Sequence, residues 1–347
     1  DRPYTVHAGS AKSALSGPAG MKMWGPYEWQ APYYWYSEEA KGNAVGFNTE
    51  IGIGAQIPVY ESLVKMIPED QLWPVGDAYD FHCTTSRDAL HDLNELKTVI
   101  EKRHGGASDL EDFLRKAHFI DYEGTRAMIE AHRVNVPRST GVIQWMLNSA
   151  WPSLYWQMYD WYLVPVSSYW SVKKGCAPQQ LIYNYGDKHV YAVNDEKEDM
   201  DLKAFMTVYG LDGNILSDAK CDVEMAAGSS IKVFETPELD KIGFVFLRLE
   251  DAKGNVVSRN EYCLAEVMDK HNWEKYRWWR TQIESYADFT ALNDLTAAEV
   301  TAEAVKTENG LNVTLENKSS VVAFFIRMSL KDDAGNLVVP AFWNDNL

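Results

Sequence analysis

The apolar residues follow two different spacings on either side of Pro178, so one fold class cannot account for the whole chain. Before this residue, the segments 88–103 and 108–133 place their apolar side chains at helical intervals. After it, short segments alternate apolar and polar residues and are separated by glycine-containing turns. A length of 347 residues is enough for roughly two or three domains. We therefore expect a multidomain chain, with an α/β part over residues 1–178 followed by all-β parts.

The first part combines amphipathic helices with short apolar strands, which is typical of α/β architecture. The run 140–147 contains few polar side chains and predicts a strand that is buried on both faces. Ser108, with Glu111 three residues later, predicts a capping box at the start of the helix over 108–133.

The second part predicts β-sandwich domains. Six short alternating segments lie between residues 181 and 263, which indicates one immunoglobulin-like sandwich over residues 179–267. Residues 268–297 are rich in Trp, and we expect them to form a connector that packs between domains. The stretch 249–257 recurs in altered form at 330–339, so residues 298–347 are expected to begin a second, truncated sandwich.

The composition excludes several classes of protein. A net charge of −17 argues against nucleic acid as a partner. Residues 179–347 hold 17 Lys and Arg against 29 Asp and Glu, and we attribute this acidity to solvated surface. No uncharged apolar run approaches the ~18 residues of a membrane span. The four cysteines form no C-x-x-C pair, which gives no support to zinc or thioredoxin sites, and the sequence does not decide whether Cys221 and Cys263 pair.

The segment 45–52 predicts a short apolar strand that ends on a carboxylate, Glu50. An unpaired charge in such a place costs several kcal/mol, roughly, so a chain keeps one there mainly for a purpose. Two roles remain open from the residues alone: an ion-paired scaffold residue, or the nucleophile of a glycoside-cleaving reaction. In a parallel barrel, the active site lies at the carboxyl ends of the strands. The segment 145–156, which runs past the end of another predicted strand, would reach the same face.

Three stretches of the chain resemble glycoside hydrolase family 2, in the branch that holds exo-β-D-glucosaminidases and β-mannosidases. They are Ser16-Gly-Pro-Ala-Gly-Met-Lys-Met-Trp-Gly-Pro-Tyr-Glu-Trp29, Gly46-Phe-Asn-Thr-Glu50 and Trp145-Met-Leu-Asn-Ser-Ala-Trp-Pro-Ser153. Weaker similarity extends over nearly the whole chain. The resemblance implies that residues 1–178 are the C-terminal portion of a (β/α)8 barrel and that the later residues are immunoglobulin-like sandwiches. It also implies a secreted or periplasmic location, although the sequence itself does not indicate one.

The resemblance implies a retaining mechanism with Glu50 as the nucleophile. Such enzymes use two carboxyl groups about 5–5.5 Å apart, one as nucleophile and one as acid/base. In the family the acid/base lies on an earlier strand, which here would be upstream of Asp1. We find no second candidate in the sequence, and we expect this chain alone to be inactive without the upstream half of its barrel.

Further site residues follow from the resemblance. Tyr27 is similar to a family tyrosine that contacts the nucleophile. Trp145 is similar to a family tryptophan that forms the floor of the sugar-binding site. Core packing is the alternative role for both. The weaker substrate-binding candidates are Asn48, His82, Asn148 and Trp151. No cofactor and no metal is expected, and the expected partner is an oligosaccharide or polysaccharide.

Three functions compete at this point. The first is a retaining exo-β-glycosidase for terminal β-linked glucosamine, of the chitosan type. The second is a β-mannosidase, which is less favoured because many β-mannosidases of the family carry Asp where this chain has Ser149. The third, of another class, is a non-catalytic carbohydrate-binding or structural module.

Overall fold

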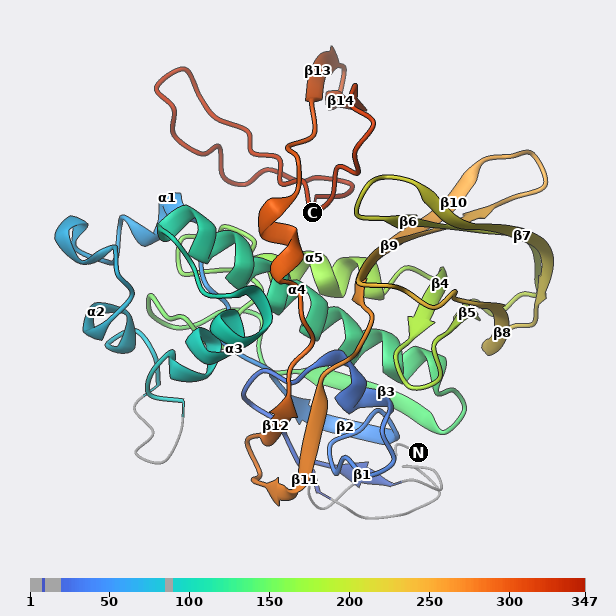
Figure 1. Ribbon diagram of the computed structural model, residues 1–347, viewed down its shortest axis with the longest axis horizontal. Helices are drawn as coiled ribbons and strands as arrows, with labels where there is room; N and C mark the ends of the chain where they lie inside the picture. Colours follow the sequence, from blue (N-terminus) through green and yellow to red (C-terminus); the bar gives the residue numbers. More distant parts are fainter. Residues whose placement is uncertain (1–7, 10–19, 85–89, 347) are drawn as a thin grey trace, which may run out of the picture.

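The computed structural model describes residues 8–9, 20–84 and 90–346. Residues 16–19 of the first matching stretch, and the first two residues of the helix expected over 88–103, lie outside these ranges. Figure 1 shows a long central helix with a small sheet below it, a β-sandwich to one side and two hairpins from the last third of the chain.

A small parallel sheet carries the first part of the chain. In the ranges that the structure describes, it has the order β1-β2-β3, with β1 at Met21–Lys22, β2 at Gly46–Ile51 and β3 at Ser139–Gln144. The connection from β2 to β3 contains the short helices α1 (Tyr60–Leu63) and α2 (Asp77–Asp80), then α3 (Asn94–His104) and α4 (Leu110–Val134). Two 3-10 turns, η1 (Pro32–Tyr36) and η2 (Glu69–Gln71), lie in the loops. Parallel neighbours joined through helices are what the α/β pattern predicted.

The cap of α4 differs from the predicted one by one residue. Asp109, not Ser108, is the N-cap, and its carboxylate accepts a hydrogen bond from the backbone N–H of Asp112 at 2.9 Å. Asp112 in turn accepts from the Ser108 N–H at 3.0 Å. The capping box with Glu111 was therefore wrong, because the adjacent aspartate supplies an equally good acceptor one position later.

Helix α4 is buried on nearly all sides, because it lies between the parallel sheet, α5 (Ser167–Gly175) and the sandwich (Figure 1). The indole N–H of Trp29 donates to the Ile120 carbonyl at 2.9 Å. A Cβ at Gly124 would lie 2.6 Å from that indole nitrogen, so this close approach requires glycine. Helix α4 therefore sets the position of every layer around it.

The prediction that the run 140–147 is buried on both faces was wrong. Ile143 is 52% exposed and Leu147 is 60% exposed. Strand β3 is an edge of the sheet within the described residues, where its only strand partner is β2. The apolar sequence predicted a buried layer, but nothing described in the structure covers the outer side of this strand.

The β-sandwich predicted after Pro178 is confirmed. One sheet has the order β10-β9-β6-β7 and the other the order β4-β5-β8, and every pairing is antiparallel. The strands are β4 (Gln179–Asn184), β5 (His189–Asn194), β6 (Met200–Gly210), β7 (Ile215–Met225), β8 (Ser229–Glu235), β9 (Ile242–Glu250) and β10 (Val256–Ala265). Cys221 lies on β7 and Cys263 on β10, at opposite edges of one sheet, and both thiols are free.

A buried polar network joins the sandwich to α4. Glu130 on α4 accepts hydrogen bonds from the Tyr262 hydroxyl at 2.8 Å and the Asn260 amide at 2.7 Å. The Arg126 guanidinium lies over the Tyr262 ring, 4.2 Å from its centroid. Buried charges are tolerated only when they are paired and hydrogen-bonded in this way, so the network fixes the sandwich against the helix.

The Trp-rich segment is an ordered hairpin, β11 (Lys270–Tyr276) with β12 (Thr281–Ser285). Its Trp279 carbonyl accepts the backbone N–H groups of Tyr27 and Glu28 at 2.7 and 3.0 Å. In Figure 1 the hairpin lies beside the parallel sheet. The segment therefore packs on the first part of the chain.

The last residues form a 3-10 turn, η3 (Thr290–Asp294), an exposed hairpin of β13 (Val300–Thr307) and β14 (Gly310–Asn317), and an extended tail. The internal repeat has a structural counterpart. Asp251 and Asp332 each begin the same turn, in which the carboxylate accepts the N–H of Asn255 or Asn336 at 2.8 Å. None of the helices in the described ranges combines the length and apolarity needed to cross a bilayer.

Candidate active site

Glu50 lies in an irregular part of β2, near the carboxyl end of the strand. Asn48 pairs with Val142 of β3 and Ile51 pairs with Gln144, so β2 carries one extra residue between these pairs. Such a bulge redirects a side chain relative to strict alternation. Asn48 and Ile51 are fully buried, whereas Glu50 is partly exposed. The bulge therefore separates the carboxylate from the buried face of the strand.

Tyr27 holds one oxygen of this carboxylate. Its hydroxyl donates to Glu50 Oε1 at 2.6 Å, a length typical of a hydrogen bond to a charged acceptor. Burial, and then the hydrogen bond to Glu50, raise the pKa of Tyr27 well above its ordinary value, so the phenol remains a donor. Among the described residues, no donor contacts Glu50 Oε2. One oxygen is thus oriented, and the other is available for chemistry.

Two tryptophans from distant parts of the chain hold Tyr27. The rings of Trp156 and Trp278 meet the Tyr27 ring edge-on, with centroids 5.9 and 5.5 Å away. The Trp156 indole also donates to the Tyr27 carbonyl at 2.8 Å. Trp278, on the turn of the β11–β12 hairpin, is 54% exposed. Sequence reasoning did not assign these two residues to the site, and its only signal for Trp278 was the Trp-rich composition of that segment.

Trp145 lies beside the end of the strand that carries Glu50. Its backbone N–H donates to the Ile51 carbonyl at 2.7 Å, and its side chain is 41% exposed. A Cβ at Gly52 would lie 1.9 Å from the Trp145 carbonyl oxygen. Gly52 is therefore what allows the ends of β2 and β3 to approach so closely, and this approach brings an exposed indole next to the carboxylate strand.

Asn48 faces helix α4 instead of the carboxylate. Its amide donates to the Asn43 carbonyl at 3.2 Å and lies 2.7 Å from Nε2 of His132. Burial lowers the pKa of His132 to about 4, so the ring is neutral and can accept this hydrogen bond. Because a bulge separates Asn48 from Glu50, the structure does not bring these two candidates together.

His82 is engaged with the backbone. Its Nδ1 lies 2.7 Å from the Pro152 carbonyl and its Nε2 lies 3.1 Å from the Met66 carbonyl. Its ring stacks on Trp151, with centroids 5.5 Å apart. Both ring nitrogens are occupied, which favours a structural role for His82, and Trp151 offers a sugar only its uncovered face. Asn148 is exposed on the same loop, where its amide contacts the Ser149 carbonyl at 3.3 Å.

Glu28, the neighbour of Tyr27, is directed away from Glu50. Its carboxylate lies 3.3 Å from Arg280, which also pairs with Glu95. Burial raises the pKa of Glu28 to about 7, although the neighbouring Arg280 guanidinium acts to lower it. In the part of the chain that the structure describes, no second carboxyl group hydrogen-bonds Glu50 or Tyr27, and no group of acidic, His or Cys side chains could hold a metal.

Two family models match the second half of the chain. Residues 186–269 match a mannosidase Ig/CBM-like domain, and residues 278–347 match the Ig-fold domain of exo-β-D-glucosaminidases. The first of these ranges falls within the sandwich and its link to β11, and the second runs from the turn of the β11–β12 hairpin onward.

Longer matches cover nearly the whole chain. An exo-β-D-glucosaminidase of Hypocrea jecorina is 36% identical over 96% of this chain and 40% of its own length. The crystal structure of an exo-chitosanase of Amycolatopsis orientalis superposes with a TM-score of 0.88 and 32% identity, over 98% of this chain and 42% of that one. A β-D-mannosidase of Dictyoglomus thermophilum shares the fold, with a TM-score of 0.67 and 21% identity over 88% of this chain and 34% of that one. The chain thus spans about 40% of the length of the relatives that it matches.

Proposed function

Because this chain belongs to the exo-β-D-glucosaminidase and β-mannosidase branch of glycoside hydrolase family 2, we propose that it supplies the nucleophile, Glu50, of a retaining exo-acting β-glycosidase. The observation that carries this proposal is the 2.6 Å hydrogen bond from Tyr27 to one oxygen of a carboxylate at the end of a parallel strand. The second oxygen of Glu50 has no donor among the described residues, and the exposed Trp145 follows the end of the neighbouring strand.

In the proposed reaction, Glu50 attacks the anomeric carbon of the terminal sugar, and the bond to the leaving oxygen breaks. An acid/base residue protonates that oxygen, and it then activates the water that releases the sugar from Glu50. Tyr27 orients the carboxylate throughout. Trp145, with 41% of its side chain exposed, offers a flat apolar surface for the sugar ring.

We propose that the acid/base comes from outside this chain. The parallel order of β1, β2 and β3 is compatible with the last strands of a (β/α)8 barrel, and the apolar outer side of β3 would pack against the remaining strands. The chain covers about 40% of its relatives, so the rest of their length has room for that half. On this proposal residues 1–178 belong to the barrel, 179–267 to the first sandwich, 268–297 to the connector and 298–347 to the second sandwich.

Terminal β-linked glucosamine is the substrate that the comparisons favour. The relatives at 32–36% identity are named exo-β-D-glucosaminidases, and solved structures of the Amycolatopsis protein include a complex with PNP-β-D-glucosamine. The named mannosidases are 21–24% identical, which is weaker support for the β-mannosidase alternative. Hydrolysis rates on nitrophenyl β-glucosaminide and β-mannoside would decide between the two sugars.

The test of Glu50 uses the complete gene product that carries this sequence. We expect Glu50→Gln to lower kcat on nitrophenyl β-glucosaminide by about 10³-fold or more, because an amide cannot form the glycosyl intermediate. The matched control is Glu224→Gln, which changes an exposed carboxylate on β7. Full activity of Glu50→Gln would refute the assignment.

The 347-residue chain by itself is the second test. We expect it to show no hydrolysis of the same substrate, because the acid/base is not among its residues. Turnover by the isolated chain would show that the acid/base lies within it. An inactive complete gene product that still binds chitosan oligomers would instead favour the non-catalytic alternative.

A further inference from the structure

A hollow of the surface lies on the hairpin that carries Trp278, and Glu50 is not among the residues that line it. It has a volume of about 890 Å³ and is bounded by η1, by the turn between β4 and β5, and by β11 and β12. We call it the hairpin groove. Its lining includes Tyr33, Glu39, Glu266, His271, Trp273 and Glu274. A volume of this size is sufficient for a ligand of one to a few sugar units.

The groove has an excess of unpaired negative charge. Among the described residues, three of its carboxylates have no ion-pair partner: Glu39, Glu266 and Glu274. Lys188 is the single unpaired cation among the residues that line it. The other two carboxylates have ion-pair partners: Asp269 lies 3.3 Å from Arg103, which also pairs with Glu123, and Glu284 lies 3.4 Å from Lys270. The free charge of the groove therefore favours a cation.

A buried histidine in the groove lacks any hydrogen-bond partner. His271 is only 3% exposed, and neither of its ring nitrogens is hydrogen-bonded among the described residues. Buried polar side chains nearly always have a partner in folded proteins, so this orphaned ring indicates a group that the protein alone does not supply. Burial lowers the pKa of His271 to about 4. The neutral ring offers one donor and one acceptor, which matches a sugar hydroxyl, since a hydroxyl both accepts and donates.

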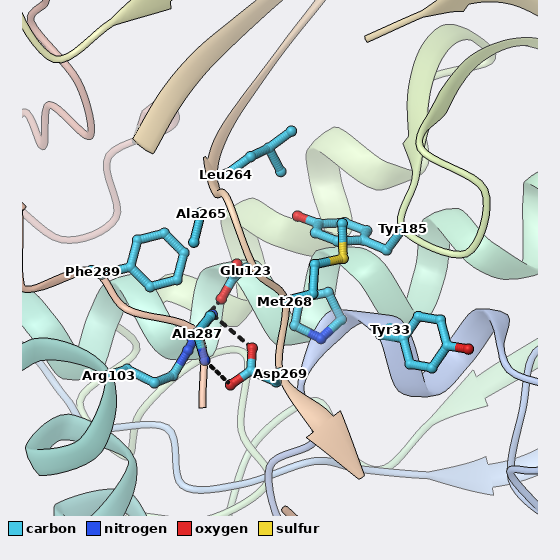
Figure 2. A pocket seen from close by; sticks show the side chains of 11 residues that line it. Tyr33, Arg103, Glu123, Tyr185, Leu264, Ala265, Met268, Asp269, Ala287 and Phe289 are labelled. Carbon is cyan, nitrogen blue, oxygen red and sulfur yellow. Dashed lines mark hydrogen bonds and ion pairs between the residues drawn. The ribbon is translucent and has the colours of Figure 1, made fainter. Parts of the chain in front are cut away.

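Aromatic surface lies next to these polar groups. His271 stacks on Trp273, with centroids 4.9 Å apart and planes inclined by 22°, and Trp273 is half-buried at the groove wall. Figure 2 shows a neighbouring pocket, which shares Tyr33, Tyr185, Met268 and Asp269 with the groove, and there Glu123 and Asp269 both pair with Arg103. Flat aromatic faces suit the apolar face of a pyranose ring.

We propose that the hairpin groove is a second binding site, for the protonated amino-sugar units of an oligomeric or polymeric substrate. The carboxylates of Glu266 and Glu274 would attract the ammonium groups, Trp273 would stack on a ring, and His271 would bind a hydroxyl. The identity of the ligand depends on the function proposed above. Because Trp273 and Trp278 belong to one hairpin, a polymer held in the groove would stay tethered near the site at which its end is cut.

The experiment measures, by calorimetry, binding of a β-1,4-linked glucosamine tetramer to the complete gene product that carries this sequence. It is done near pH 6, where an amine with a pKa of about 8 is protonated. Every variant carries Glu50→Gln, so that catalysis cannot consume the probe. We expect Glu266→Gln with Glu274→Gln, and separately Trp273→Ala, to weaken binding by about fivefold or more. The matched controls Glu224→Gln and Phe342→Ala, which change an exposed acid and an exposed ring elsewhere, should leave the affinity unchanged.

Glu266 and Glu274 are exposed, so their variants should fold. They therefore test the groove even if Trp273→Ala fails to fold. Binding to the groove should weaken as salt is raised, and the neutral N-acetylated tetramer should bind several-fold more weakly. Unchanged affinity in the groove variants, equal affinity for the neutral tetramer, or no binding at all would each overturn the inference. The role of Glu50 is tested separately by hydrolysis, so one proposal can fail while the other stands.

Discussion

Removal of the Tyr27 hydroxyl is the most direct probe of the site. Tyr27→Phe deletes the donor of the 2.6 Å hydrogen bond to Glu50 Oε1 and keeps the ring that packs against Trp156 and Trp278. The Tyr27 ring is buried, but Glu50 is partly exposed, so water can replace the lost donor at the carboxylate. We therefore expect the variant to fold, with a loss of stability below about 1 kcal/mol.

The effect on catalysis should be larger than the effect on stability. A hydrogen bond to a charged group contributes about 1.5–3 kcal/mol, and 1.4 kcal/mol corresponds to a factor of 10. In the proposed reaction, the negative charge would return to Glu50 when water releases the sugar, and Tyr27 would stabilise that charge as it forms. A loss of about 2 kcal/mol in this step predicts a kcat about 30-fold lower.

The kinetic signature distinguishes this role from simple damage. If release from Glu50 is slowed, the glycosyl-enzyme accumulates, and a burst of nitrophenol should precede the slow steady state. KM should fall together with kcat, because the intermediate is drained more slowly. The assay is rapid-mixing kinetics of the complete gene product on nitrophenyl β-glucosaminide, with Tyr209→Phe as the matched control on a half-buried tyrosine of strand β6.

Three results would refute this reasoning. A Tyr27→Phe variant with unchanged kcat would show that the hydrogen bond has no part in the reaction. A variant with raised KM and unchanged kcat would place Tyr27 in substrate binding only. A large drop in thermal stability would show that the hydroxyl serves the fold, not the carboxylate.

The remaining predictions concern the structure around the site. Gly52→Ala should lower the free energy of unfolding by about 1–3 kcal/mol, because the added Cβ would lie 1.9 Å from the Trp145 carbonyl oxygen. Urea denaturation measures this change, and an unchanged midpoint would contradict the close approach of the two strands. Glu28 has a pKa of about 7 in the folded state and an ordinary value of 4.5, so the folded state binds this proton more tightly than the unfolded state does. The free energy of unfolding should therefore fall as pH rises from about 4.5 to about 7. Glu28→Gln should flatten the thermal-denaturation profile there, and a profile identical to that of the wild type would refute the shift. Glu130→Ala should cost about 3–5 kcal/mol, because it removes one of the two carboxylates beside the buried Arg126 and the acceptor of the Tyr262 hydroxyl and the Asn260 amide. A change below about 1 kcal/mol would show that the network does not fasten the sandwich.

The sequence allowed the repeating features to be predicted, because they depend on local spacing. The helical intervals of residues 108–133 correspond to α4, and the alternation after Pro178 corresponds to the sandwich strands. Glu50 was located by a single charge at the end of an apolar strand, and its contact with Tyr27 was anticipated from the family resemblance.

Other features depend on contacts that the local sequence does not encode. Whether Ile143 is exposed depends on whether another element packs against β3, and the apolar run itself does not determine this. The direction of Asn48 is decided by a bulge, which no composition signal marks. The packing of Trp278 on Tyr27 joins residues about 250 positions apart, so only the folded chain reveals it.

The Trp279 carbonyl accepts hydrogen bonds from the backbone N–H groups of both Tyr27 and Glu28. Protein engineering must therefore keep the β11–β12 hairpin. A shortened version that keeps the parallel sheet and discards everything after the first sandwich would lose this anchor, together with the aromatic edge of Trp278. The phenol that aligns Glu50 would then rest on a backbone with two free N–H groups. Removal of the residues after the first sandwich would therefore disturb the proposed catalytic centre even though Glu50, Tyr27 and Trp145 were retained.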